Sequence, residues 1–189
     1  MSFLGISLPA DVCRLFRDIN CPGNKVDMGT YHITMLYIGD KTPISVVTKA
    51  IEVAAPVMQQ TRPFDLQVRK IGHFPENPDD RPGHPIIARV DSPMLHELRG
   101  ELAQAFDDRE VPYSKKFPDF NPHVTLSYSP EPFETELEEP IKWTCSETVL
   151  WAGDDYGDRF IVTFQLPREG PKYEGFEQFE HEIRALLNS

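Results

Sequence analysis

The sequence predicts an α+β protein in which two antiparallel sheets flank a central cleft and helices lie on the outside. Three observations support this fold class. Two strand-like runs carry the same short motif, two amphipathic helices lie between these runs in the sequence, and further strand-like runs are available to pair with the motif strands. The 189 residues can bury a core without a second domain. We therefore expect residues 1–189 to form one two-lobed domain, with residues 170–189 as a C-terminal docking helix.

The first half of the chain is predicted to alternate strands and helices. Residues 3–8 are expected to form a strand, residues 10–19 a short helix, and residues 31–39 the first motif strand. Thr42 and Pro43 then have the pattern of a helix N-cap followed by proline at the first helical position. The helix that follows carries apolar residues at helical spacing: Ile44, Val47, Ile51, Ala54 and Met58.

The second half begins with two predicted strands, at residues 64–74 and 85–91, separated by a proline-rich loop. Ser92 and Pro93 repeat the cap and proline pattern before a second helix. Its apolar stripe consists of Leu95, Leu98, Leu102, Ala105 and Phe106.

The region after the second motif strand is predicted to contain a turn and a hairpin. The acidic stretch at residues 130–140, PEPFETELEEP, is expected to form a turn. Two strands follow, at residues 142–152 and 159–166, and GDDYG between them has the composition of a hairpin turn.

The composition limits the classes of partner. The chain has 19 basic and 30 acidic residues, and a net charge of −11 argues against a surface that binds long duplex nucleic acid. Cys13, Cys21 and Cys145 lack the spacing of a metal or redox motif, and the N-terminus has no basic start before its short apolar stretch. We therefore expect a cytoplasmic protein without a membrane partner. Among nucleic-acid ligands, the charge favours a small nucleotide or short oligonucleotide over a long duplex.

One motif occurs twice, as His32-Ile33-Thr34 and His123-Val124-Thr125, each inside a strand-like run. Alternate side chains of an extended strand share a face, so the His and the Thr of each motif should point the same way. The opposite faces are expected to be apolar and to carry Ile33, Met35, Tyr37, Val124, Leu126 and Tyr128.

Two imidazoles and two hydroxyls that face each other are suited to the cleavage of a phosphodiester. A neutral His accepts a proton from the nucleophile, a protonated His donates one to the leaving oxygen, and the hydroxyls hold the phosphoryl oxygens. We therefore predict His32, Thr34, His123 and Thr125 as catalytic residues, with no metal ion and no cofactor. A zinc site would need about three protein ligands, and no carboxylate lies close to either motif in the strands.

Two further regions contain candidates for substrate binding. Residues 109–122 interleave aromatic and basic side chains, of which Tyr113, Lys115, Lys116 and Phe120 could bind a base and a phosphate. A solvated loop with its aromatic residues in the core would explain the same pattern. Trp151 and Tyr156 could stack on a base if their hairpin overhangs the site, although Trp151 would equally suit a core position.

The pair of His-x-Thr strands resembles the signature of the two-histidine (2H) phosphoesterase superfamily, which includes 2′-5′ RNA ligase-like and cyclic phosphodiesterase-like proteins. The resemblance implies the two-lobed fold and activity on 2′,3′-cyclic phosphates, 2′-5′ linkages or cyclic oligonucleotide messengers. In many bacterial RNA-end enzymes of the family an Arg closely follows the second motif, whereas Leu126, Ser127 and Tyr128 follow it here. We predict a metal-independent phosphodiesterase; the alternative is a nucleotide- or RNA-end-binding module with little catalytic activity.

Overall fold

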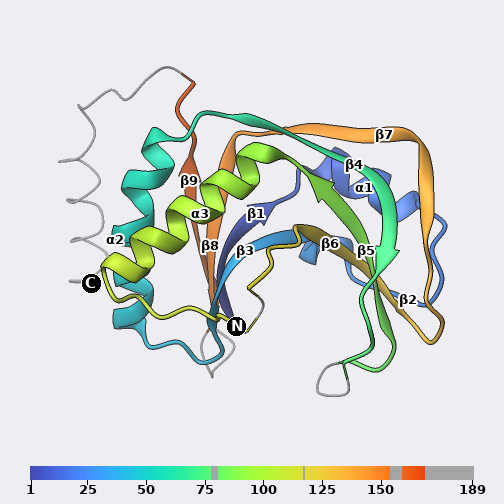
Figure 1. Cartoon of the computed structure of the whole chain (residues 1–189), viewed down its shortest axis with the longest axis horizontal. Helices are drawn as coiled ribbons and strands as arrows, with labels where there is room; N and C mark the ends of the chain where they lie inside the picture. The colour runs from blue at the N-terminus through green and yellow to red at the C-terminus, as the bar shows by residue number, and fades with distance from the viewer. Residues whose placement is uncertain (78–80, 117, 154–158, 169–189) are drawn as a thin grey trace.

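The structure, a computed structural model, describes residues 1–77, 81–116, 118–153 and 159–168. It confirms the α+β class with two antiparallel sheets (Figure 1). The first sheet has four strands in the order β3 (His32–Gly39), β1 (Ser2–Ser7), β8 (Glu147–Gly153) and β9 (Arg159–Gln165). The second sheet, which is strongly curved, has five in the order β2 (Asn24–Lys25), β6 (His123–Ser129), β5 (His84–Asp91), β4 (Phe64–His73) and β7 (Thr135–Cys145).

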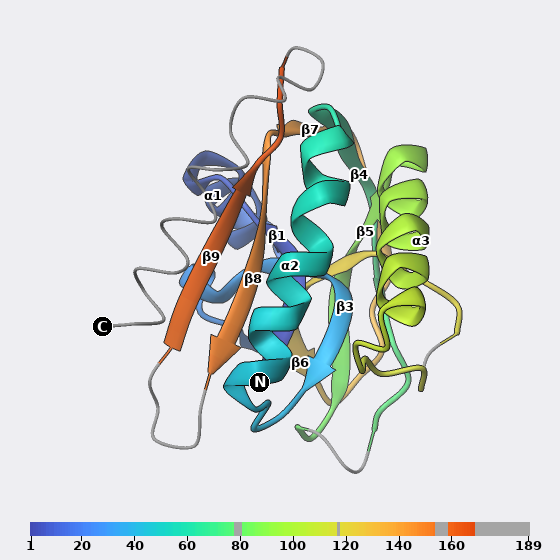
Figure 2. The ribbon, with the colours of Figure 1, turned by 90° about the vertical axis from the view of Figure 1, so that its left-hand side faces the viewer.

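The described residues include three α-helices, which lie outside the sheets. Helix α2 (Ile44–Gln60) packs against β8 and β9, and α3 (Pro93–Asp108) packs against β3 and β4 beside α2 (Figure 2). Helix α1 (Ala10–Asp18) packs against β7 and the 3-10 helix η1 (Met28–Thr30). None of the helices among the described residues is long and apolar enough to cross a membrane. The predicted C-terminal helix falls outside the described residues.

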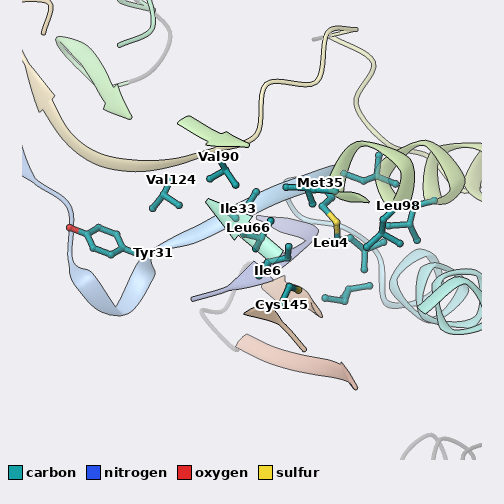
Figure 3. Packing of buried hydrophobic residues seen from close by; sticks show 14 of the residues in the cluster. Leu4, Ile6, Tyr31, Ile33, Met35, Leu66, Val90, Leu98, Val124 and Cys145 are labelled. Carbon is teal, nitrogen blue, oxygen red and sulfur yellow. The ribbon is translucent and has the colours of Figure 1, made fainter. Parts of the chain in front are cut away.

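The core lies between the helices and the faces of the two sheets that turn toward them. Ile33 and Val124, the middle residues of the two motifs, are both fully buried in one continuous apolar cluster (Figure 3). Leu4 and Ile6 of β1 belong to the same cluster. The predicted inward orientation of the two middle residues is therefore confirmed, and the His and Thr of each motif lie on the opposite face of their sheet, here called the motif face.

Each motif strand contains a β-bulge that sequence alternation could not predict. Between β1 and β3, Leu4 opposes Leu36 and Gly5 opposes Thr34, so that Met35 is an extra residue. Opposite residues of antiparallel strands share a face, and a bulge shifts the alternation beyond it by one residue. Tyr37, which opposes Phe3, therefore lies on the motif face, and its predicted place on the apolar back is wrong.

The second motif strand repeats this irregularity. Ile86 opposes Ser127 and Ile87 opposes Thr125, so that Leu126 is the extra residue of β6. Tyr128 opposes Pro85, two residues from Ile87, and so it also lies on the motif face. The prediction for Tyr128 is wrong for the same reason.

The acidic turn predicted at residues 130–140 is also wrong, because β7 already begins at Thr135. This strand is the last strand of the second sheet, so one of its edges pairs with no other strand among the described residues. Charged residues and proline are characteristic of such edge strands, which explains why the acidic sequence forms one. The strand predicted at 142–152 is two strands, since Cys145 ends β7 in the second sheet and Glu147 begins β8 in the first.

The predicted caps of the two long helices are present only in part. The Thr42 hydroxyl donates to the Gly39 carbonyl over 3.2 Å and caps no helical N–H group, and Pro43 occupies the N-cap position itself. Ser92 is the N-cap of α3 with Pro93 at the first helical position, as predicted, but its hydroxyl has no hydrogen-bond partner in the described part of the chain.

Candidate active site

The fold brings the two motif histidines to the line where the sheets meet. His32 is the first residue of β3 and His123 the first residue of β6, and these two strands lie side by side (Figures 1 and 2). Both imidazoles are half-buried. They are close enough for the charge of one to lower the pKa of the other, as His32 does for His123.

The two imidazoles are held by matching hydrogen bonds. Nδ1 of His32 lies 2.7 Å from the carbonyl oxygen of Thr30, and Nδ1 of His123 lies 2.7 Å from that of Asn121. A carbonyl oxygen only accepts, so each Nδ1 carries the proton that it donates. Each Nε2 is then left with a lone pair when the ring is neutral and with a transferable proton when the ring is charged.

Local structure explains the position of the Thr30 carbonyl. It belongs to the last residue of η1, whose N-cap residue Asp27 accepts a hydrogen bond from the Gly29 N–H over 2.7 Å. The Thr30 hydroxyl also donates to the Asp27 carbonyl over 2.7 Å. This capped turn fixes the chain immediately before His32.

The motif threonines lie two residues further along each strand. Thr34 opposes Gly5 of β1, and Thr125 opposes Ile87 of β5. Gly5 is required there because a Cβ atom would lie 2.3 Å from the Ile33 carbonyl oxygen. Neither threonine hydroxyl has a hydrogen-bond partner within the described residues, so both can donate to a ligand.

The two histidines differ in their surroundings. His32 stacks on Phe3 with 4.5 Å between ring centroids, and Trp151 lies 5.9 Å from it at a small interplanar angle. His123 instead contacts the Phe74 ring at right angles, with 4.8 Å between centroids, and it opposes Arg89 of β5. The site therefore has an aromatic side on the first sheet and a cationic side on the second.

Burial lowers the pKa of both histidines, because a half-buried imidazolium loses part of its hydration. The carbonyl hydrogen bond from each Nδ1 partly offsets this effect. For His123 the charges of His32 and Arg89 lower the pKa further. Both rings therefore favour the neutral form near pH 7 when no substrate is bound.

The structure places the predicted aromatic and basic loop against α3 and the end of β3. Tyr113 donates through its hydroxyl to Asp107 over 3.2 Å, and Lys115 forms a 2.8 Å salt bridge with the same carboxylate. This contact raises the pKa of Lys115 and lowers that of Asp107. The Ser114 N–H donates to the Tyr37 carbonyl over 2.7 Å, which attaches the loop to the first motif strand.

The other predicted substrate-binding residues are more scattered. Phe120 contacts His96 and Arg99 of α3, with 5.1 Å between the rings and 5.7 Å to the guanidinium carbon. Lys116 is exposed on the loop. Only Trp151 is brought next to a motif histidine, and Tyr156 lies outside the described residues. Substrate binding by these residues remains a prediction.

Several residues of the motif face were not predicted from the sequence. Phe3, Phe74 and Arg89 contact or oppose the histidines. Phe3 belongs to β1, Arg89 belongs to β5, and Phe74 directly follows β4, and the sequence does not reveal how these strands pair. In the part of the chain that the structure describes, no three His, Cys, Asp or Glu side chains are grouped as metal ligands would be.

Comparison with known proteins identifies the family. A sequence model of the 2′-5′ RNA ligase superfamily matches residues 25–157, which include both motifs. The chain belongs to this superfamily. No curated protein sequence matches it significantly. Its fold is similar to that of TT0787 from Thermus thermophilus, with a TM-score of 0.69 at 18% identity, covering 88% of this chain and 97% of that one.

Two further solved structures show the same fold. E. coli LigT in complex with 3′-AMP has a TM-score of 0.64 at 18% identity and covers 87% of this chain and 94% of its own. A structure described as a phosphoesterase has a TM-score of 0.63 at 18% identity and covers 87% of this chain and 95% of its own. This superfamily member therefore shares its fold, over most of its length, with proteins of distant sequence.

Proposed function

We propose that this member of the 2′-5′ RNA ligase superfamily is a metal-independent phosphodiesterase. Its substrate would be a small nucleotide or oligonucleotide that contains a 2′,3′-cyclic phosphate, a 2′-5′ linkage or the ring of a cyclic oligonucleotide messenger. The observation that carries the proposal is the matching pair of Nδ1 hydrogen bonds, which leaves the Nε2 atoms of His32 and His123 available for two proton transfers.

The reaction needs one imidazole in each protonation state. The neutral His accepts a proton from a water molecule through Nε2, and the water oxygen forms a bond to phosphorus. As the bond between phosphorus and the leaving oxygen breaks, the charged His donates its Nε2 proton to that oxygen. The hydroxyls of Thr34 and Thr125 donate hydrogen bonds to the phosphoryl oxygens, whose charge grows in the transition state.

The surroundings favour His123 as the base and His32 as the acid. Arg89 opposes His123, and a nearby cation stabilises the neutral imidazole. His32 stacks on Phe3 beside Trp151, and the faces of aromatic rings attract a cation.

The solved structures of LigT support a nucleotide as substrate. That protein was crystallised with 3′-AMP, with NADP+ and with ATP, so the shared fold can hold nucleotides in E. coli LigT. For this chain the net charge of −11 favours a compact ligand with few phosphates.

The test is hydrolysis of a substrate panel in the presence of a metal chelator. The panel would contain nucleoside 2′,3′-cyclic phosphates, 2′-5′ linked oligoadenylate and cyclic dinucleotides. Turnover of at least one substrate, lost in the double variant His32→Ala/His123→Ala, would support the proposal. Binding without turnover would instead indicate a nucleotide-binding module.

A further inference from the structure

The second sheet carries a row of polar and charged side chains that begins at a motif histidine. Antiparallel pairing places four residues opposite one another across four strands: His123 of β6, Arg89 of β5, Lys70 of β4 and Glu136 of β7. Because opposite residues share a face, the whole row lies on the motif face. On the first sheet the residue opposite His32 is the uncharged Ser7, so the two halves of the site differ here.

The Arg89 guanidinium extends from β5 over β4, where a glycine makes room for it. A Cβ atom at Gly72 would lie 2.7 Å from Nε and 3.2 Å from an Nη atom of Arg89. Gly72 opposes Ile87, and Ile87 opposes Thr125. The guanidinium therefore lies level with Thr125 but two strands away from β6, about 10 Å at the usual strand spacing of about 4.8 Å.

The hydrogen-bond donors of the Arg89 guanidinium are available to a ligand. Its neighbour Lys70 forms a 2.8 Å salt bridge with Glu134, which lowers the pKa of that carboxyl group, and the charge of Arg89 also helps to lower this pKa. Arg89 forms no salt bridge with any of the residues that the structure describes. A guanidinium has five donors in a planar fork that matches two oxygens of a phosphate.

We propose that Arg89 binds a second phosphate of the substrate, adjacent in the nucleotide chain to the phosphate that is attacked. The attacked phosphate must lie within hydrogen-bond reach of both Nε2 atoms, between β3 and β6. The guanidinium lies over Gly72 of β4, two strand spacings or about 10 Å from β6, which is beyond hydrogen-bond reach of a phosphate held between β3 and β6. This inference rests on the proposed function and specifies its substrate class, an oligonucleotide with two or more phosphates.

Binding measurements test the subsite separately from catalysis. The probes are adenosine 3′-monophosphate, with one phosphate, and a triadenylate with a 3′-phosphate, which has three and offers a neighbour on either side of its middle phosphate. Calorimetry with wild type, Arg89→Gln and Gly72→Ala would be run at low and physiological salt. Arg62→Gln, at an exposed position between α2 and β4, is the control for the lost charge.

We expect Arg89→Gln to weaken triadenylate binding about 10- to 100-fold, the value of a hydrogen-bonded charge, and to change mononucleotide binding less than about twofold. The salt slope for triadenylate should become shallower by about 0.7, which corresponds to one phosphate contact. Gly72→Ala should weaken the same probe while Arg89 is retained, because the new Cβ displaces the guanidinium. Arg62→Gln should change neither probe.

Equal weakening of both probes by Arg89→Gln, or no weakening of either, would overturn the inference. Thermal unfolding of each variant checks that the fold is retained. Failure of the proposed function has a different signature: wild type would hydrolyse no substrate of the panel, whereas the selective loss of triadenylate binding in Arg89→Gln would persist.

Discussion

Met35 and Leu126 occupy equivalent β-bulges, each three residues after the histidine of its motif strand. In both strands the bulge brings the tyrosine at the fifth position, Tyr37 or Tyr128, onto the face that carries the His and the Thr. The two halves of the site therefore repeat one another in backbone geometry as well as in sequence. The halves differ in their surroundings, with Phe3 and Trp151 beside His32 and Arg89 opposite His123, and these differences are the basis of the acid and base roles that we propose.

Replacement of either motif histidine by alanine should abolish turnover and leave the fold intact, because both imidazoles are half-buried and lie on the motif face. Each positioned acid or base contributes about 10²- to 10⁴-fold to the rate. A nitrophenyl phosphodiester separates the roles, since its leaving group departs without a proton. We expect His32→Ala to recover most of its loss on this substrate and His123→Ala to recover little. The reverse pattern would exchange the roles of acid and base. If both variants kept activity close to that of wild type on every substrate, the histidines would have no acid–base role.

Replacement of Thr34 or Thr125 by valine removes a hydroxyl but keeps the shape of the side chain. If each hydroxyl stabilises the phosphoryl oxygens in the transition state, its loss should cost about 2–4 kcal/mol in kcat/KM. Thr144→Val is a matched control, because this strand threonine is bonded to Asp65, its partner on β4. Wild-type kinetics in both motif variants would exclude the threonines from the site.

The sequence was sufficient to predict the fold class and the pair of motif strands, because alternation and a repeated motif are local signals. It could not predict that the apolar-looking Tyr37 and Tyr128 face the site, since the bulges arise from pairing with β1 and β5. The prediction of a turn at residues 130–140 is wrong for a similar reason. Only the position of β7 at the edge of the sheet explains a strand so rich in acidic residues. Arg89 is a candidate for substrate binding only because β5 pairs with β6, and this pairing cannot be read from the sequence.

The dependence of kcat/KM on pH follows from the lowered pKa values of His32 and His123. The active form carries one proton on the pair, and its population is greatest between the two apparent pKa values. Since both lie below the ordinary value of about 6.5, the maximum of kcat/KM should lie below pH 6.5 and activity should fall toward pH 8. A steady rise to pH 8 that is lost in chelator would indicate a metal-bound hydroxide instead.

The same pKa shifts make stability depend on pH. Below about pH 6.5 the histidines of the unfolded chain bind protons that those of the folded protein do not. The free energy of unfolding should therefore fall as the pH is lowered from about 6.5 toward the lowered pKa values of the folded protein. Above about pH 6.5 this contribution to stability is fully present. Urea unfolding at pH 7.5 and 5.5 measures this loss. The double variant His32→Gln/His123→Gln should lose less stability between these two pH values than wild type does. An equal loss in both proteins would mean that other groups cause the dependence.

Replacement of Gly5 by alanine tests how closely β1 must approach the first motif strand. Alanine there would place its Cβ atom 2.3 Å from the Ile33 carbonyl oxygen and 3.0 Å from the Phe3 ring. Because a backbone atom cannot move aside cheaply, we expect Gly5→Ala to destabilise the fold by about 1–3 kcal/mol. It should also reduce kcat, since Ile33 adjoins His32 and Phe3 stacks on its ring.

Gly100→Ala in α3 is the matched control for this substitution, because a Cβ atom there would meet nothing within 4 Å. It should stabilise the protein by about 0.5–1 kcal/mol, the usual gain for alanine inside a helix, and leave kcat unchanged. Thermal and urea unfolding of the two variants, together with their kinetics, would decide the point. If Gly5→Ala were as stable and as active as wild type, β1 could shift away from β3 without moving His32, and the close packing of these strands would have no part in positioning the histidine.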